Sequence, residues 1–220
     1  MGNLLDYIYI VPAALIAIIL HELAHGLMSY WLGDPTPKRQ GRLSLNPLNH
    51  LDLVGTLCLI FFHVGWAKPV VINPEYYKKK KLGMFLVALA GPFVNILICI
   101  TSMVIYAIFL KVCFKLNISN DSLYYVVGTL LMTIALINLG LAIFNLLPIP
   151  PLDGSKILGS FLKGEVYEQY MKYQQYGFII LSLILVLSAM SGAGLSFITE
   201  AVDYVFNFIW HIICVLFSLN

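Results

Sequence analysis

The sequence predicts an all-α polytopic membrane protein, with about five transmembrane helices and a re-entrant or short β element after the first. Of its 220 residues, 60% are hydrophobic and only 11% are charged, whereas soluble domains contain about 25% charged residues. The apolar residues gather in long runs, as helices that cross a bilayer require. We therefore expect one membrane-embedded domain over residues 1–220, in contact with the lipid bilayer. The net charge of +2 gives no reason to expect a nucleic-acid partner.

Five apolar runs are the expected transmembrane helices. They cover about residues 7–32, 82–110, 122–147, 176–190 and 205–219. Gly33-Asp34-Pro35 ends the first helix, and the prolines between 148 and 151 end the third. The last run is short, and Glu200 and Asp203 precede it. It could therefore lie in the membrane interface instead of spanning.

The apolar run between the first two helices is too short to span as a helix. Residues 53–64 number about a dozen, whereas a spanning helix needs about 20. We expect residues 51–72 to form a re-entrant or interfacial element, and a short tilted span is the alternative. Residues 43–47, just before it, alternate like a short strand.

The basic residues favour one orientation. If the N-terminus lies outside and residues 51–72 do not cross, Lys111 and Lys115 are the only basic residues outside, which leaves 11 of the 13 inside. An excess of Lys and Arg is typical of cytoplasmic loops. The four cysteines form no C-x-x-C pair, and we expect them to be packing residues without disulfide bonds. They are Cys58, Cys99, Cys113 and Cys214.

A candidate metal site lies in the first helix. His21-Glu22-Leu23-Ala24-His25 reads H-E-x-x-H, and two histidines four residues apart lie on one helix face, where both can bind one zinc ion. Zinc lowers the pKa of a bound water to roughly 7, and Glu22 could act on that water as general base. The motif also arises by chance, but ionisable groups directly after an apolar run are costly in lipid and usually functional.

A catalytic zinc requires three protein ligands and an open position. Asp153 follows the prolines that end the third helix, and its carboxylate could reach a metal on a neighbouring helix. It could equally cap a helix that begins at Gly154. The remaining histidines, His50, His63 and His211, are not at a spacing known from zinc peptidases. The residue pattern alone leaves the third ligand open.

The sequence resembles the site-2 protease family of intramembrane zinc metalloproteases. The matching motifs are H-E-x-x-H at 21–25, Gly-Pro-Phe-Val-Asn at 91–95, and the stretch from Asn145 to Gly154, which fits N-x-x-P followed by L-D-G. The likeness covers about residues 7–165. Residues 41–47 and 65–69 are similar to the compact bacterial branch, which lacks PDZ and CBS modules.

The resemblance implies one zinc ion per chain. His21, His25 and Asp153 resemble the family's zinc ligands, and Glu22 resembles its catalytic base. Asn145 resembles the asparagine that contacts the substrate backbone or the developing oxyanion, and a bare interhelical hydrogen bond is the alternative. The catalytic core would then span about residues 7–165, with additional helices over about 176–219.

Asn95 and His50 are two further polar residues that could lie near the site. We interpret Asn95 as a group that packs helices together or supports a ligand from behind. His50 could line the site, but we expect a solvated histidine in a loop. The resemblance also implies that a segment after the first helix pairs with an unwound substrate as a strand, for which residues 43–46 or 54–64 could serve.

The implied function is zinc-dependent hydrolysis of a peptide bond within a transmembrane segment of another membrane protein. The enzyme would be a multi-pass protein of a bacterial plasma membrane, with its active site toward the cytoplasm. A zinc or cation transporter could use the same ligands, and an inactive scaffold is a second alternative, against which the intact Glu22 argues. The sequence does not identify the substrate, a regulating partner or the oligomeric state.

Overall fold

The computed structural model of the chain describes residues 6–50, 52, 68–118, 120–174, 176–177, 179–181, 183 and 196–219. This part of the chain is helical and contains no strand, which confirms the predicted all-α class for it. Four helices are long and apolar enough to cross a membrane: α1 (Tyr7–Trp31), α4 (Lys80–Lys115), α5 (Asp121–Asn145) and α9 (Ser196–Leu216). The shorter elements are α2 (Thr36–Arg39), η2 (Pro47–Asn49), η3 (Pro74–Tyr76), α6 (Asp153–Phe161) and α7 (Gly164–Gln174).

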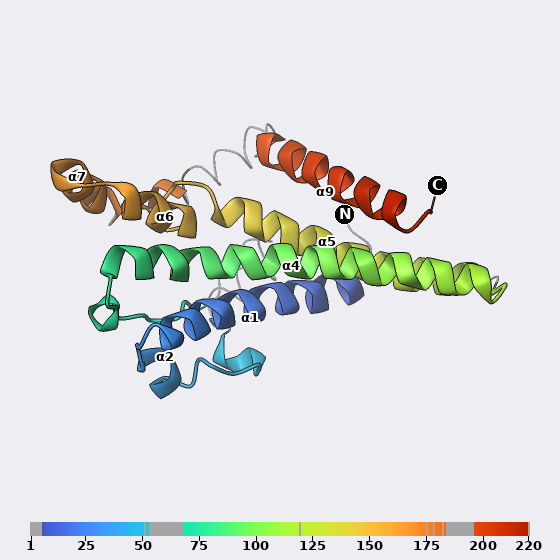
Figure 1. Cartoon of the computed structure of the whole chain (residues 1–220), viewed down its shortest axis with the longest axis horizontal. Helices are drawn as coiled ribbons and strands as arrows, with labels where there is room; N and C mark the ends of the chain where they lie inside the picture. Colours follow the sequence, from blue (N-terminus) through green and yellow to red (C-terminus); the bar gives the residue numbers. More distant parts are fainter. Residues whose placement is uncertain are drawn as a thin grey trace.

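The long helices form a bundle around α4. Helices α1, α4 and α5 all contact one another, α9 packs on α5 and α4, and α6 packs on α4 (Figure 1). Helix α4 has 36 residues and is about 54 Å long by helical rise, so it extends beyond a hydrocarbon core about 30 Å thick. The short helices α2, α6 and α7 gather at the end where α1 finishes and α4 begins (Figure 1).

The buried faces of α1 and α4 repeat every four residues. On α1 the repeat comprises Ala13, Ala17, His21, His25 and Ser29. On α4 it comprises Gly83, Val87, Gly91, Asn95, Cys99, Met103 and Ala107. Residues at this spacing lie along one helix face, and small residues let helix backbones approach closely inside a membrane. The two faces bring the polar groups of both helices into the interior of the bundle.

An apolar core lies between α4, α5 and α9. It comprises Cys99, Met103, Ala107, Ala135, Leu139, Ile198, Val202 and Ile213. Cys99 and Cys113 are buried and, like Cys214, carry free thiols, as predicted for packing cysteines. Cys58 lies outside the described residues. Ala135 and Leu139 of α5 belong to this apolar core. The neighbouring Asn138 contacts Asn95 of α4 instead.

The predicted helices match the structure closely where their ends carry strong signals. Helices α1 and α5 agree with the predicted first and third helices to within two residues. Helix α4 is longer than residues 82–110, because the lysines at its two ends are good helix formers and can reach toward the headgroups. The predicted run 176–190 and the predicted re-entrant element 51–72 lie mostly outside the described residues.

The predicted start of the last helix is wrong. Helix α9 begins at Ser196, and not near residue 205, so Glu200 and Asp203 lie within the helix. Both carboxylate side chains are exposed, and for that reason they do not interrupt the helix. At 21 residues, α9 is long enough to span by length.

The predicted strand over residues 43–47 is also wrong. Residues 44–46 have no regular structure, and the 3₁₀ turn η2 follows them. The side chain of Asn46 accepts a hydrogen bond from the Leu48 amide and begins this turn, while Arg42 donates to the Asn49 carbonyl. A strand needs a partner, and the described residues provide none.

A buried carboxylate connects the end of α1 to the segment that precedes α4. Asp34 accepts hydrogen bonds from the Ser29 hydroxyl (2.8 Å), the Thr36 amide (2.9 Å) and the Asn73 amide (2.7 Å). The Ser29 hydroxyl also contacts the Tyr77 hydroxyl at 2.7 Å. Burial disfavours the charge on Asp34, but the hydrogen bonds outweigh it and lower the pKa of this carboxyl. Asp34 and Ser29 therefore connect Asn73 and Tyr77 to the end of α1.

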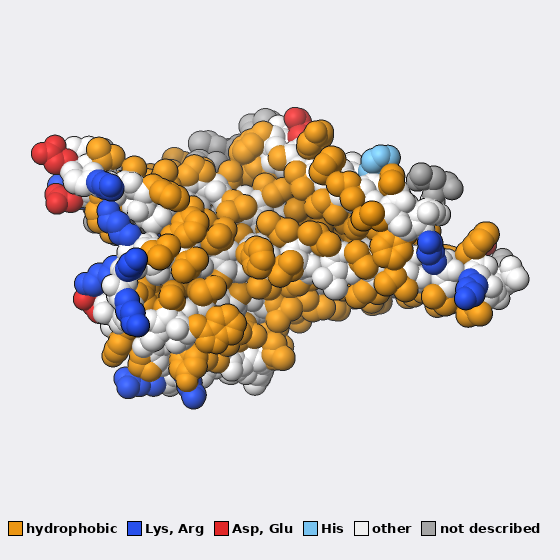
Figure 2. Space-filling view, viewed as in Figure 1, with side chains coloured by type: hydrophobic (Ala, Val, Ile, Leu, Met, Phe, Trp, Pro, Cys, Tyr) orange, Lys and Arg blue, Asp and Glu red, His pale blue; other side chains and the backbone are white. Residues whose placement is uncertain are grey.

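Charged and apolar side chains are segregated along the bundle. Figure 2 shows Lys and Arg side chains at the two ends and a broad apolar belt between them. Exposed residues of the end formed by α2, α7 and the start of α4 include Lys38, Arg39, Lys78, Lys79, Lys80, Lys81 and Lys163. Lys111 and Lys115 lie at the end of α4. Such an apolar belt is typical of a protein surface in contact with lipid.

Candidate metal centre

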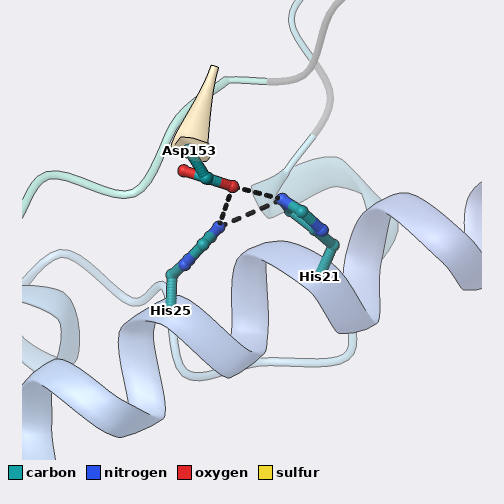
Figure 3. A group of neighbouring side chains, drawn as sticks. All are labelled: His21, His25 and Asp153. Carbon is teal, nitrogen blue, oxygen red and sulfur yellow. Dashed lines mark hydrogen bonds and ion pairs between the residues drawn. The ribbon is translucent and has the colours of Figure 1, made fainter. Parts of the chain in front are cut away.

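Three buried side chains, two from α1 and one from the start of α6, converge in the interior. Asp153 Oδ2 lies 3.1 Å from His21 Nε2 and 3.0 Å from His25 Nε2, and the two Nε2 atoms are 3.0 Å apart (Figure 3). The histidines come from successive turns of α1, whereas Asp153 is 128 residues further along the chain than His25. The structure therefore brings together the three residues that were predicted as metal ligands.

Asp153 is not an N-cap in this structure. Helix α6 begins at Asp153 itself, Leu152 is at the N-cap position, and no side chain caps the helix. A Cβ atom on Gly154 would collide with the carbonyl groups of Leu146 and Leu147, so α6 can begin in close contact with the end of α5 only because residue 154 is glycine. This contact turns the Asp153 carboxylate toward the histidines.

Each oxygen of Asp153 has its own partner. Oδ2 faces the two histidines, and Oδ1 accepts a hydrogen bond from the Lys156 ammonium group at 3.1 Å. Because Lys156 holds Oδ1 on the far side, a single oxygen of Asp153 is directed at the centre. The sequence reading did not identify Lys156, although its position three residues after Asp153 in a helix places it on the same face.

Helix α4 orients both histidine rings. His25 Nδ1 donates to the Val87 carbonyl oxygen at 2.6 Å, and His21 Nδ1 lies 3.0 Å from Asn95 Oδ1. Gly91 lies between these two positions on α4, and a Cβ atom there would be 2.5 Å from His25 Nε2. The Nε2 atoms of both rings are thereby turned toward Asp153. The expectation that Asn95 supports a ligand agrees with this contact.

The donor set fits zinc. Two imidazole nitrogens and one carboxylate oxygen are the ligands of many catalytic zinc sites, which keep a fourth position open, whereas Mg²⁺ and Ca²⁺ prefer oxygen ligands. Zinc bonds of about 2.1 Å in a tetrahedral site separate the donor atoms by about 3.4 Å. The observed separations of 3.0 and 3.1 Å require only a small opening. Among the described residues, these three side chains form the group that could hold a metal ion.

Glu22 lies beside this group but is not part of it. Its Oε2 accepts a hydrogen bond from the Val70 amide at 2.9 Å, and the side chain is half-buried. Residues 68–73 form neither helix nor strand. This segment crosses close to α1, since a Cβ atom on Gly26 would be 3.6 Å from a Val70 methyl group. The Glu22 carboxylate is therefore oriented by the backbone of a segment that lies far from it in sequence.

The other predicted residues lie in different surroundings. Asn145 is half-buried, and its amide donates to the Leu141 carbonyl of its own helix at 3.0 Å. Its assignment to substrate binding stays a prediction. The prediction that His50 is solvated is wrong, because His50 is 0% exposed and its Nε2 is 2.7 Å from the Ser44 carbonyl oxygen. The His50 carbonyl also accepts a hydrogen bond from the Lys68 amide at 2.8 Å, which connects this loop to the segment that precedes α4.

Fold and site together define a helical membrane protein with a buried His-His-Asp centre. The known proteins with similar sequences agree with this class. Residues 9–188 match Peptidase family M50. "Putative zinc metalloprotease YwhC" of Bacillus subtilis is 34% identical over 81% of this chain and 80% of its own length. "Putative zinc metalloprotease Rip2" of Mycolicibacterium smegmatis is 25% identical over 84% of this chain and 69% of its own length. No solved structure matches the chain significantly.

The chain belongs to Peptidase family M50, the site-2 protease family. It is a zinc metalloendopeptidase, and its cofactor is Zn²⁺. The resemblance that the motifs indicated is confirmed. The family match extends to residue 188, beyond the region of about 7–165 to which the motifs are confined.

Proposed function

We propose that this peptidase cuts a peptide bond within a transmembrane segment of another membrane protein. The observation that carries the proposal is the buried group of His21, His25 and Asp153 inside a bundle of apolar helices. His21 follows the start of α1 by about 21 Å of helical rise, in a helix about 38 Å long. A centre at this depth would meet substrates inside the hydrocarbon core, which is about 30 Å thick.

The proposed roles follow from the positions of the side chains. His21, His25 and Asp153 hold the zinc ion, which when bound supplies a Lewis acid for the scissile carbonyl and for water. Glu22 removes a proton from the attacking water and returns it to the leaving amine. The Val70 amide, 2.9 Å from Oε2, holds one oxygen of Glu22 and leaves the other for this proton transfer.

Substrate binding in this proposal requires an unwound peptide. A peptide bond within a helix is shielded by its neighbours, so the substrate must be extended before it is cut. Asn145 is the proposed contact with the substrate backbone or the developing oxyanion, and its amide would have to exchange its present bond to Leu141. The segment that would pair with the substrate is residues 43–46 or 54–64; residues 44–46 form no strand in the structure, and residues 54–64 lie outside the described part.

The proposed location is a bacterial plasma membrane, with the active site toward the cytoplasm. The basic residues support this orientation, since only two of the 13 fall in the segments assigned to the outside. A single domain over residues 1–220 is proposed, with the catalytic core over about 7–165. Family membership favours the enzyme over a cation transporter, and the intact Glu22 argues against an inactive scaffold.

Co-expression with candidate single-pass substrates tests the proposal. The native chain is expected to release a cytoplasmic fragment, and Glu22→Gln is expected to abolish cleavage while one zinc ion per chain remains bound, because Glu22 acts as base and not as ligand. Metal analysis of the purified variant accompanies the cleavage assay. Loss of zinc from Glu22→Gln would make Glu22 a ligand, and undiminished cleavage would remove it from the mechanism.

A further inference from the structure

His21 is one end of a line of hydrogen bonds that crosses three helices. Its Nδ1 contacts Asn95 Oδ1 on α4 at 3.0 Å. Asn95 Nδ2 donates to Asn138 Oδ1 on α5 at 3.1 Å, and Asn138 Nδ2 donates to the Ile134 carbonyl at 2.8 Å. Both asparagines are 0% exposed, so water does not compete for these bonds. The line ends at a backbone oxygen, which can only accept.

That backbone oxygen determines the direction of every bond in the line. Because the Ile134 carbonyl accepts, Asn138 must turn its NH₂ group toward it and its oxygen toward Asn95. Asn95 must then donate to Asn138, and the same NH₂ group lies 3.4 Å from the Ala17 carbonyl. The oxygen of Asn95 is left facing His21, which must carry its proton on Nδ1. A neutral imidazole has one N–H, so His21 Nε2 keeps a free lone pair.

We propose that Asn138 is a positioning residue that sets the tautomer of His21 from two hydrogen bonds away. The proposal rests on the proposed role of His21 as a zinc ligand, since the free lone pair is on the atom that faces His25 and Asp153. Without Asn138, the remaining acceptor for the Asn95 NH₂ group is the Ala17 carbonyl, whose 3.4 Å contact is longer than an ordinary N–H···O bond, so the amide can rotate and present its NH₂ group to His21. The ring would then carry its proton on Nε2, where the metal should bind.

His25 provides an internal comparison, because no side chain sets its tautomer. Its Nδ1 donates directly to the Val87 carbonyl at 2.6 Å, and this oxygen can only accept. Substitutions on α5 should therefore disturb one histidine and leave the other in place. Loss of an outer partner of a metal-binding histidine typically weakens metal affinity about 10–100-fold. An ordinary hydrogen bond between membrane helices would affect stability and not the metal.

Two variants of the full-length chain separate these possibilities. In Asn138→Ser the short hydroxyl can bond back to the Ile134 carbonyl but cannot reach Asn95, so the line is broken without leaving a large unpaired group. In Asn138→Asp the neutral acid donates its O–H group to the Ile134 carbonyl and accepts from the Asn95 NH₂ group through its other oxygen. Both hydrogen bonds of Asn138 are thereby restored with their native donor and acceptor. Leu139→Ala is the packing control, because Leu139 is the next residue on α5 but faces the apolar core.

The readouts are the zinc Kd, from chelator competition in detergent, the absorption spectrum of the Co²⁺-loaded protein, and Tm. We expect Asn138→Ser to weaken zinc binding about 10–100-fold with an altered Co²⁺ spectrum, and Asn138→Asp to restore both. Leu139→Ala should lower Tm and leave Kd and spectrum native. A native Kd and spectrum in folded Asn138→Ser would overturn the inference, as would failure of Asn138→Asp to restore them. His21→Ala is measured in parallel, and if it binds zinc like the native chain, the proposed ligand set itself fails.

Discussion

The two carboxylate oxygens of Asp153 have different partners. Oδ2 contacts both histidines, and Oδ1 is held by Lys156 at 3.1 Å. The carboxylate is buried, and a buried carboxylate is costly unless its oxygens are paired. Lys156 pairs Oδ1, whereas Oδ2 faces the Nε2 atoms of two histidines whose Nδ1 atoms contact α4, so a cation between Oδ2 and these nitrogens would complete the pairing. These surroundings suit a zinc ligand better than a residue that only begins a helix.

At this scale we predict different outcomes for Asp153→Ala and Asn145→Ala. Asp153→Ala should weaken zinc binding by more than the roughly 100-fold that marks the upper range for outer partners, and should abolish cleavage. Asn145→Ala should reduce cleavage and leave the zinc Kd unchanged, because Asn145 bonds only within its own helix. Chelator competition and a cleavage assay check both variants. Native zinc affinity in Asp153→Ala would mean that the third ligand lies elsewhere in the chain.

Helix α4 acts as a template for the histidine pair of α1. Val87, Gly91 and Asn95 are four residues apart and lie along one buried face. The outer two supply hydrogen-bond acceptors for the two Nδ1 atoms, and the glycine between them makes room for the rings. The close approach of α1 and α4 and the orientation of the two histidine rings therefore depend on the same three positions.

We predict that Gly91→Ala disrupts the centre whereas Gly140→Ala does not. A Cβ atom at position 91 would be 2.5 Å from His25 Nε2 and 2.7 Å from His21 Cε1, while one at position 140 would have no atom within 4 Å. Gly91→Ala should therefore displace both rings and weaken zinc binding at least about tenfold. Gly140→Ala should keep the native Kd and gain up to about 1 kcal/mol of helix stability. Equal zinc affinities in the two variants would contradict the template role of α4.

The whole molecule combines an apolar belt with a polar centre inside it. Lys and Arg side chains occupy the two ends (Figure 2), and the buried histidines, asparagines and aspartate lie between helices and away from the belt. The contacts of His21 with Asn95, of His25 with Val87 and of Asn95 with Asn138 join polar groups of different helices, so these groups need no water inside the bilayer. The charged ends and the apolar belt determine how the bundle sits in the membrane.

Single cysteines test the proposed orientation. Gln40→Cys, Lys80→Cys and Leu116→Cys, in a background without the native cysteines, place thiols at exposed positions. An impermeant thiol reagent applied to intact cells should label only position 116, because the proposed cytoplasmic segments include 40 and 80. Permeabilised cells are the control and should be labelled at all three positions. Labelling of position 40 or 80 from outside would reverse the proposed orientation.

Much of the fold and two of the three residues of the candidate centre could be predicted from local patterns in the sequence, and the family resemblance implied the third, Asp153. Runs of apolar residues predicted α1 and α5 nearly to their ends, and the spacing of His21 and His25 predicted that both rings lie on one face. Family membership was predicted from the order of three short motifs. Each of these signals depends on neighbours along the chain, so one sequence is enough to read it.

The residue pattern left other points open, and the tertiary structure decided them. Whether Asp153 caps a helix or faces the histidines depends on how α6 packs against the end of α5, and the two alternatives have the same local sequence. The burial of His50 and the partnership of Asn138 with Asn95 depend on segments that meet only after folding. The physical reason is that hydrogen-bond partners and solvent exposure are set by contacts between distant residues, whereas helix formation is set largely by near ones.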